Sequence, residues 1–336
     1  MLTCSVIVPA YRAADVLPRC LAALRDQSVT CDSYEIIVVD DGSPDQTADV
    51  AEKILADVSH SVAGRVIRAP HGGPAHARNL GAQAAHGALL AFTDADCEPA
   101  HDWLEHLTAP LREATVSGAK GVYRTRQKSL VARFVQQEYQ DKYDRLANLD
   151  SIDFVDTYSA AYRREVFLAS GGFDEAFTTA SVEDQEFSFR LAAQGHRLVF
   201  APQAVVYHQH DATLGEYARR KFGIGYWKML VLKRHPRKLV SDSHTPQVLK
   251  VQMGVLAAAL LTTVGTVLNY QAWVLAADVC WLLLLVSMLP LLSKIARRDP
   301  AIIVVAPLLI GARALCLGLG LLRGFQRFAL QPKSPA

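Results

Sequence analysis

The chain has 336 residues, of which 51% are hydrophobic, and its formal net charge at pH 7 is +2. This length exceeds what one ordinary domain needs, and apolar residues crowd the C-terminal third, so we expect a soluble domain followed by a membrane region. The small net charge points to no particular partner. The six cysteines show no C-x-x-C spacing, which argues against a disulfide framework and a zinc site.

The N-terminal part of the chain alternates strand patterns with helical patterns. The clearest strands are expected at residues 6–8, 35–39, 66–69 and 88–92, and weaker strand patterns follow at 198–200 and 205–207. Helical periodicity predicts helices at residues 15–26 and 44–58, and weaker helical patterns follow at 129–147 and 183–193. A capping box at residues 43–46 is expected to open the second helix. We therefore predict an α/β domain over residues 1–212, with a mostly parallel sheet and helices on both faces.

Pairs of carboxylates follow two of these strands, Asp40 with Asp41 and Asp94 with Asp96. Ligands of open α/β sheets bind at the carboxyl edge of the strands, and clustered carboxylate oxygens suit a divalent cation that also holds phosphates. Asp40 or Asp41 can accept the ring N–H of a nucleotide base whose face is covered by residues 9–11. The alternatives are a helix cap for the first pair and an ordinary strand-to-loop turn for the second.

Polar groups also stand at the start of two predicted helices. Arg78 follows a pair of glycines and offers a planar fork of donors to phosphate, in a segment that lacks the G-x-G-x-x-G fingerprint of dinucleotide folds. Glu183 and Asp184 open a later helix. Because a helix N-terminus lowers the pKa of a carboxylate, we expect Asp184 to stay ionised at neutral pH and to accept a proton from a sugar hydroxyl. A charged helix cap is the alternative for this pair.

In order and spacing, these segments resemble the family 2 glycosyltransferases, which are inverting enzymes with the GT-A fold. The resemblance covers about residues 3–235. The stretches that carry it are Val6-Ile7-Val8-Pro9-Ala10-Tyr11, Val38-Val39-Asp40-Asp41-Gly42-Ser43, Gly72-Gly73, Ala77-Arg78-Asn79-Leu80-Gly81, Asp94-Ala95-Asp96, Gly171-Gly172-Phe173-Asp174 and Glu183-Asp184. It implies a Rossmann-like GT-A domain that transfers a sugar from a nucleotide sugar.

The resemblance also implies roles for individual residues. Asp184 would be the catalytic base, and Asp96 together with Asp94 would bind Mg²⁺ or Mn²⁺ on the diphosphate. The acceptor or the transferred sugar would lie against Gly172, Phe173 and Glu183. The nucleotide sugar would be held by Pro9, Ala10, Tyr11, Asp40, Asp41, Gly73, Arg78, Asp94 and Ala95.

Three further features bear on the metal and on processivity. His208 and His210 follow a strand pattern where some relatives place a metal-binding histidine. His208 is the candidate ligand because it is nearer the strand, and a surface or interfacial role is the alternative for both. Cys97 stands where many relatives carry a third acidic residue, which weakens the expected metal site. The chain has no Q-x-x-R-W sequence, the signature of processive polysaccharide synthases, so we expect transfer of one sugar per encounter.

The C-terminal third predicts membrane helices within residues 251–322. Between Lys250 and Lys294 the only charged residue is Asp278, and the interval divides near residues 269–271. Each half is close to the roughly 20 residues that span a bilayer. We therefore predict a hairpin of two membrane helices, at about residues 251–268 and 272–292.

A third apolar run, at residues 301–322, contains Pro307 and Arg313, so it spans the membrane, re-enters it or lies along the interface. Basic residues between the second and third runs favour the cytoplasmic side, and the chain starts without a secretory signal. We expect a multi-pass protein of the cell (inner) membrane with a cytoplasmic catalytic domain. If the third run spans, basic residues of the tail at 323–336 fall outside, against the positive-inside rule.

Residues 213–250 are expected to form a basic amphipathic connector at the membrane surface. Eight Lys or Arg residues and one Glu lie between positions 213 and 240, interleaved with aromatic residues. Such a segment attracts anionic lipid head groups. A nucleic-acid-binding helix has similar chemistry, but the position beside the predicted hairpin favours membrane lipids, and we expect no nucleic-acid partner.

We therefore predict a metal-dependent inverting glycosyltransferase. Its donor would be a UDP-, dTDP- or GDP-linked sugar, because uracil, thymine and guanine all offer a ring N–H. Its acceptor would be a hydroxyl of a lipid-linked or other membrane-proximal glycan. The alternatives are a catalytically inactive, membrane-tethered nucleotide-binding module and a phosphatase of the haloacid dehalogenase type. The phosphatase motif requires Thr or Val where this chain has Glu98.

Overall fold

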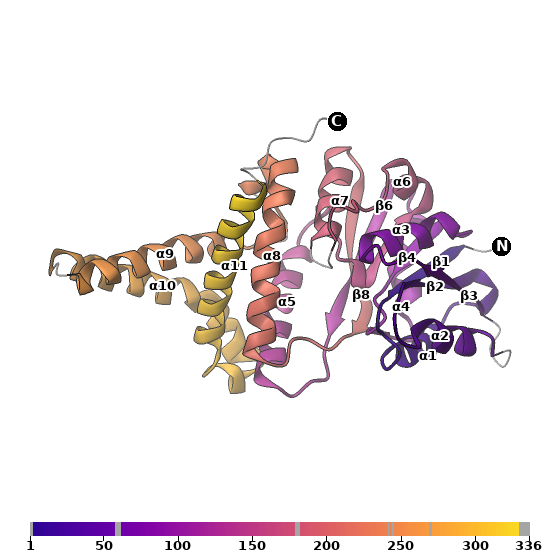
Figure 1. The fold of residues 1–336 in the computed structure, drawn as a ribbon, viewed down its shortest axis with the longest axis horizontal. Coiled ribbons are helices and arrows are strands. Elements are labelled where there is room, and N and C mark those ends of the chain that lie inside the picture. Colours follow the sequence, from indigo (N-terminus) through magenta and orange to yellow (C-terminus); the bar gives the residue numbers. More distant parts are fainter. Residues whose placement is uncertain are drawn as a thin grey trace. The chain divides into compact units, whose positions relative to one another are not determined.

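The computed structural model describes residues 3–57, 62–178, 182–240, 242–243, 245–268 and 271–328. It divides into two compact units, the first made of Met1–Arg126 and Tyr143–Gln209, the second of Gln127–Lys142 and His210–Ala336. The first unit contains the sheet, and the second contains the long C-terminal helices (Figure 1). The predicted division of the hairpin at 269–270 and the tail from residue 329 onward lie outside the described residues.

The strands of the first unit form one sheet in the order β3-β2-β1-β4-β7-β6-β8-β5. Its N-terminal half is parallel, as the alternating pattern of the sequence predicts. This half consists of β1 (Cys4–Ala10), β2 (Tyr34–Asp41), β3 (Ala63–Ala69) and β4 (Leu89–Phe92). β1 and β2 are buried along almost their whole length, because helices cover both faces of this part of the sheet.

The second half of the sheet mixes directions. β7 pairs antiparallel with β4 and β6, whereas β6 and β8 pair in parallel. These strands are β5 (Glu98–Pro99), β6 (Val116–Arg124), β7 (Ala160–Arg163) and β8 (Arg197–Tyr207). The predicted α/β class with a Rossmann-like N-terminal half is confirmed, and the whole sheet is mixed.

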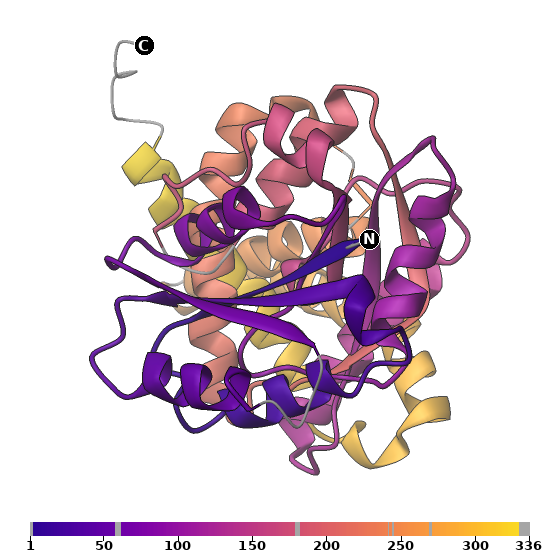
Figure 2. The same ribbon diagram turned by 90° about the vertical axis from the view of Figure 1, so that its right-hand side faces the viewer.

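Helices α1 and α2 lie on one side of strands β1–β3, and α3 lies on the other (Figure 2). The helices of the first unit are α1 (Leu17–Arg25), α2 (Thr47–Leu55), α3 (Pro74–Ala84), α4 (Trp103–Thr108), α6 (Arg164–Ala169) and α7 (Glu183–Ala193). Two sequence predictions differ from the structure in detail, the start of α2 and the division of β8.

The predicted capping box at the start of α2 does not form. The Ser43 hydroxyl accepts a hydrogen bond from the backbone N–H of Arg12 at 3.0 Å, and the helix starts beyond it, at Thr47. The Asp45 carboxylate accepts instead from the backbone N–H of Thr47 at 3.2 Å, where α2 begins. α2 therefore begins at Thr47, about one turn later than predicted, and its N-cap residue Gln46 makes no side-chain cap.

Strand β8 is continuous where the sequence predicts two separate strands. The interruption in the pattern is Pro202, which is exposed and lies where the register between β6 and β8 shifts. Proline is tolerated in a strand at such irregularities because no ladder hydrogen bond is lost there. The irregularity ends with Val205, which pairs with Val122 of β6.

The second unit consists of α5 (Leu130–Leu146) up to Lys142, α8 (Leu214–Arg234), α9 (Gln247–Val267), α10 (Gln271–Arg298) and α11 (Ala306–Phe328). By length and composition, α9, α10 and α11 are each able to cross a membrane. α9 and α10 match the predicted hairpin, and α11 contains most of the third apolar run.

A buried charged network connects four helices of the second unit, α5, α8, α9 and α11. Glu138 of α5 accepts hydrogen bonds from Tyr217 of α8 at 3.0 Å and from Arg313 of α11 at 2.8 Å. Its second oxygen lies 2.9 Å from the Lys221 ammonium group. Arg313 also donates to the side chain of Gln252, near the start of α9, at 3.1 Å. Arg313, which the sequence shows only as an interruption of an apolar run, is thus buried and paired.

Candidate active site

Strands β1, β2 and β4 end at one edge of the sheet. Ala10 pairs with Asp40 across β1 and β2, and Ile7 pairs with Phe92 across β1 and β4. The residues that follow these strands therefore emerge on the same side, with Asp94 two positions beyond the end of β4. The structure brings the predicted N-terminal site segments together at this edge, and Ala10 itself is buried in the sheet.

Asp41 fastens the loop that leads into α3. Its carboxylate accepts hydrogen bonds from the backbone N–H groups of Gly72 at 2.8 Å and Gly73 at 3.0 Å, and the His71 ring lies 2.8 Å from one oxygen. Gly73 has a φ of 91°, a conformation that favours glycine. Asp41 thus fixes the loop before the helix that carries Arg78.

Asp40 has an unused acceptor. One of its oxygens accepts from the backbone N–H of Ser43 at 3.3 Å, whereas Oδ1 is buried with no hydrogen-bond partner among the described residues. A buried acceptor without a partner fits a ligand that brings its own donor. Nearby in the sequence, the half-buried Pro9 precedes Tyr11, which is 42% exposed and stacks on His71 with ring centroids 4.5 Å apart.

Arg78 joins two segments that lie far apart in the sequence. Its guanidinium group is buried and donates to Asp94 at 2.7 Å and to Glu183 at 2.8 Å. One planar fork therefore holds the loop after β4 against the N-terminus of α7. This contact brings the predicted metal segment and the predicted base segment to a common site.

The acidic group after β4 fits a divalent cation. Asp94, Asp96 and Cys97 each place a potential ligand atom within 4.8 Å of the others, and the buried Ala95 lies between the two carboxylates. The His208 ring lies 3.2 Å from an Asp96 oxygen. Burial, followed by the charges of Asp94 and Asp96, raises the pKa of the Cys97 thiol well above its ordinary value. The donors suited to Mg²⁺ or Mn²⁺ are therefore the two carboxylates, with the imidazole beside them.

Asp184 is a buried carboxylate at the start of α7. It accepts hydrogen bonds from the backbone N–H groups of Gln185 at 2.7 Å and Thr157 at 3.4 Å. Burial, and then the negative charge of Glu183, raise the pKa of Asp184 to about 7, although Arg78 acts in the opposite direction. The expectation that the helix N-terminus would lower this pKa is wrong, because desolvation outweighs the favourable dipole and amides.

Lys120 is a buried lysine whose charge acts on Asp184, and the sequence does not reveal it. It is fully buried on β6, forms an ion pair with Asp156 and donates to the Tyr158 hydroxyl at 3.3 Å. Its positive charge also acts to lower the pKa of Asp184. On the same strand, Tyr123 stacks on His208 with centroids 4.6 Å apart. The only signal in the sequence is a lysine within a segment of small and apolar residues, which is a weak one.

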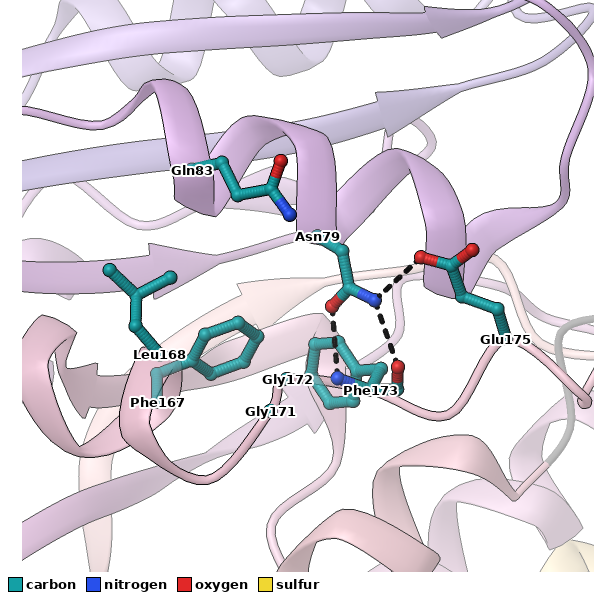
Figure 3. A pocket seen from close by; sticks show the side chains of 8 residues that line it. All are labelled: Asn79, Gln83, Phe167, Leu168, Gly171, Gly172, Phe173 and Glu175. Carbon is teal, nitrogen blue, oxygen red and sulfur yellow. Dashed lines mark hydrogen bonds between the residues drawn. The ribbon is translucent and has the colours of Figure 1, made fainter. Parts of the chain in front are cut away.

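A cavity of about 340 Å³ lies between α3, α6 and the turn at residues 171–173 (Figure 3). Asn79 holds this turn in place by accepting from the backbone N–H of Phe173 at 2.9 Å and donating to its carbonyl at 2.8 Å. A Cβ at Gly172 would overlap the Asn79 side chain, and its φ of 65° also favours glycine. Two adjacent residues of α3 therefore hold two different segments. Arg78 bonds to Asp94 after β4 and to Glu183, and Asn79 bonds to the turn at residues 171–173.

The mixed sheet with its acidic carboxyl edge has the GT-A fold. Two family models match the chain, "Glycosyl transferase family 2" over residues 5–170 and "Glycosyl transferase family group 2" over residues 96–312. The chain belongs to the family 2 glycosyltransferases.

Individual relatives agree with this family. Glycosyltransferase AglE of Haloferax volcanii is 28% identical over 233 residues, which are 66% of this chain and 71% of that protein. The pre-mycofactocin glycosyltransferase of Mycobacterium tuberculosis is 31% identical over 278 residues, which cover 80% of this chain but only 54% of the relative. The chain thus spans about half the length of the mycobacterial protein.

A solved structure shares the fold over nearly the whole chain. The mannosyltransferase PcManGT from Pyrobaculum calidifontis, determined in complex with GDP-Man and Mn²⁺, superposes with a TM-score of 0.63 at 19% identity. The match covers 97% of this chain and 87% of the mannosyltransferase. At this level of identity the likeness establishes the fold alone.

Proposed function

We propose that the protein is a metal-dependent inverting glycosyltransferase that moves a single sugar from a nucleotide sugar to a hydroxyl of a membrane-associated, lipid-linked glycan. The observation that carries this proposal is the Arg78 guanidinium, which contacts Asp94 on one side and Glu183 on the other. This contact supports the proposal because it links Asp94, one of the acids suited to a cation, to Glu183, the residue next to the proposed base Asp184.

The nucleoside is proposed to bind at the ends of β1 and β2. The unpartnered oxygen of Asp40 is available to accept a base N–H, and the exposed ring of Tyr11 can cover the base. The Asp41 carboxylate contributes by fixing the loop at Gly73, close to where the diphosphate would lie. Uracil, thymine and guanine all satisfy this arrangement. The GDP-Man bound to the mannosyltransferase PcManGT is consistent with guanine.

Asp94 and Asp96 would hold the cation, with His208 orienting Asp96. A bound Mg²⁺ or Mn²⁺ would neutralise the charge that develops on the departing diphosphate. Asp184 would take the proton of the acceptor hydroxyl as its oxygen attacks the anomeric carbon on the face opposite the leaving group, which inverts the configuration. Glu183, Gly172 and Phe173 are the proposed neighbours of the acceptor or the sugar.

The membrane part supports a membrane-associated acceptor. The helices α9, α10 and α11 are long and apolar enough to cross a bilayer, and the basic helix α8 directly precedes them. An enzyme held at the inner face of the membrane meets lipid-linked acceptors there at high local concentration. Membership of the family removes the phosphatase alternative, and a nucleotide-binding module without activity remains as an outcome of the test.

The decisive experiment uses the purified full chain in detergent with Mn²⁺. UDP-, dTDP- and GDP-sugars are screened for hydrolysis and for transfer to extracted membrane lipids. We expect one donor class to be consumed, and we expect the product to carry the anomeric configuration opposite to that of the donor. Tight binding of a nucleotide with no turnover of any donor would instead favour the inactive module.

Two variants separate the proposed roles. Asp184→Asn is expected to abolish transfer while nucleotide binding persists, because the base is lost but the donor contacts remain. Asp96→Ala is expected to weaken nucleotide binding only in the presence of the cation. Asp32→Asn, at an exposed carboxylate just before β2, is the matched control. Normal turnover by Asp184→Asn would show that another group is the base.

A further inference from the structure

Helices α8 and α11 pack against each other with their backbones in close contact. A Cβ added at Gly225 of α8 would overlap the carbonyl oxygen of Leu317. Likewise, a Cβ at Gly320 or at Gly324 of α11 would overlap carbonyl oxygens of α8. These three glycines are buried, so the two helices approach as closely as small residues permit.

The two helices run in the same direction along their whole shared length. Near their N-terminal ends, Tyr217 and Arg313 both bond to Glu138. At their C-terminal ends, the Lys233 ammonium donates to the carbonyl of Phe328 at 2.7 Å. Because the contacts extend from one end to the other, α11 must share the environment of α8.

Helix α8 is too highly charged to cross a bilayer. Its basic residues are Arg219, Arg220, Lys221, Lys228, Lys233 and Arg234. Each charge at the bilayer centre is expensive, even where a carboxylate lies beside it, as Glu138 does beside Lys221. A helix with this composition belongs in the interface or in water. The length and apolar composition of α11 alone would suggest a membrane-spanning helix. Its close packing against the charged helix α8 argues against this.

The hairpin of α9 and α10 has a different relation to the membrane. Figure 1 shows it extending crosswise from the α8–α11 pair, both elements being parts of the second unit. Lys250 at its start bonds to carbonyl oxygens at 239 and 240, and Lys294 pairs with Asp141 at 2.7 Å. The charged groups thus mark the base of the hairpin. The 17 residues of α9 beyond Lys250 reach the lower end of the length that spans a bilayer core.

We infer that, among the described helices, only the α9–α10 hairpin crosses the membrane. Helix α11 lies beside α8 in the membrane interface and does not span the bilayer. The face of α11 turned away from α8 carries exposed apolar residues for contact with lipid, namely Leu308, Leu315, Leu319, Leu322 and Phe325. The C-terminal end of α11 then stays on the same side of the membrane as the first unit, which contains the candidate active site and is called the catalytic unit below. This arrangement places Arg323 and Arg327 on the side that the positive-inside rule favours.

Thiol labelling of the full chain in a bacterial host tests the inference. Each single-cysteine variant of a cysteine-free chain is treated with a membrane-impermeant maleimide, in intact spheroplasts and after lysis. Gln271→Cys, at the start of α10 and exposed, should be labelled in intact spheroplasts. Gln326→Cys, at the exposed end of α11, should be labelled only after lysis, as should the control Asp32→Cys in the catalytic unit.

Labelling of Gln326→Cys in intact spheroplasts to the extent seen for Gln271→Cys would overturn the inference. Failure of Gln271→Cys to react before lysis would overturn the crossing of the hairpin.

Because a cysteine-free chain can fail to fold, C-terminal fusions of the native chain provide a second measurement. A fused fluorescent protein that folds only in the cytoplasm should be bright. Fused alkaline phosphatase, which is active only outside the cytoplasm, should be inactive. The opposite pair of results would refute the placement of α11. This test needs no transferase activity, so its outcome is independent of the proposed function.

Discussion

Asp184 shows how strongly burial decides the chemistry of one residue. With a pKa of about 7, a general base is partly protonated near neutral pH and must lose its proton before it can act. We therefore expect kcat/KM to rise with pH through about 7 and to level off above it. A pH profile between about pH 5 and 9 measures this limb. A rate independent of pH in that range would contradict the assignment.

Lys120 supplies a second test of the rise of kcat/KM with pH, which is called the limb of the pH profile. Its positive charge acts to lower the pKa of Asp184, so Lys120→Met should move the limb to higher pH. The double variant Lys120→Met with Asp156→Asn avoids leaving a buried aspartate alone. Lys53→Met, at an exposed lysine of α2, should leave the profile unchanged. An unmoved limb in a folded Lys120 variant would show that this lysine does not influence the base.

At this scale the sequence reveals residue types but not their environments. Asp94, Asp96 and Asp184 stand out because each follows a strand or opens a helix, which are places readable from local patterns. The pKa of Asp184 depends on how deeply the completed fold buries it, and no local pattern contains that information. Lys120 is harder still, because its partner Asp156 lies on a different segment and neither residue belongs to a motif.

Among the helices, the pairing of Glu138 with Arg313 should be a main determinant of the stability of the second unit. Both side chains are about one-tenth exposed or less, so their interaction is poorly screened. Glu138→Ala leaves Arg313 and Lys221 without their carboxylate and should cost about 3 to 5 kcal/mol. Thermal unfolding of the detergent-solubilised chain measures the loss.

The exposed pair of Glu113 and Arg197 provides the control for that experiment. Glu113→Ala should leave the melting temperature nearly unchanged, because solvent screens the interaction. Replacing Glu138 and Arg313 together by Leu and Met should recover much of the stability lost in Glu138→Ala, since no buried charge of that pair is left alone. A small effect of Glu138→Ala would mean that water reaches the network.

The glycines of α11 are expected to differ in their tolerance of side chains. Gly320→Leu should lower the melting temperature, because the added carbons meet the backbone of α8 at the carbonyl of Phe222. Gly318→Leu is the matched variant on the same helix, with open space where its Cβ would lie, and it should be tolerated. Equal effects of the two substitutions would show that helix propensity, and not packing, controls the result.

Elements with a clean periodicity were predictable from the sequence, and mixed ones were not. β1, β2 and β4 are continuous apolar runs, and α9 and α10 are long apolar helices, so their patterns suffice. β6 contains glycines and a lysine, and β7 has four residues, so neither shows a strand pattern. The placement of α11 depends on its contact with α8, which the hydropathy of α11 alone does not contain.

For the whole molecule, the basic connector should couple activity to the charge of the membrane. The full chain in anionic vesicles is expected to transfer sugar faster to a lipid acceptor than in zwitterionic vesicles, because exposed basic residues attract the surface. Arg219→Gln with Arg237→Gln should reduce this advantage, whereas Arg112→Gln with Arg124→Gln, in the catalytic unit, should not. At about 1 M salt the difference should vanish, and a difference that persists would point to a specific lipid site.

The path of the chain between its two units limits how a protease could release the catalytic part. The polypeptide passes between them after Arg126, after Lys142 and after Gln209. A single cut following Gln209 would leave a fragment that still includes α5. That helix remains paired through Arg133 with Asp299 of the severed C-terminal piece, in addition to the bonds of Glu138 and Asp141. The nicked protein should therefore stay in the membrane fraction, and shedding of a soluble enzyme would require a second break or the loss of these pairs.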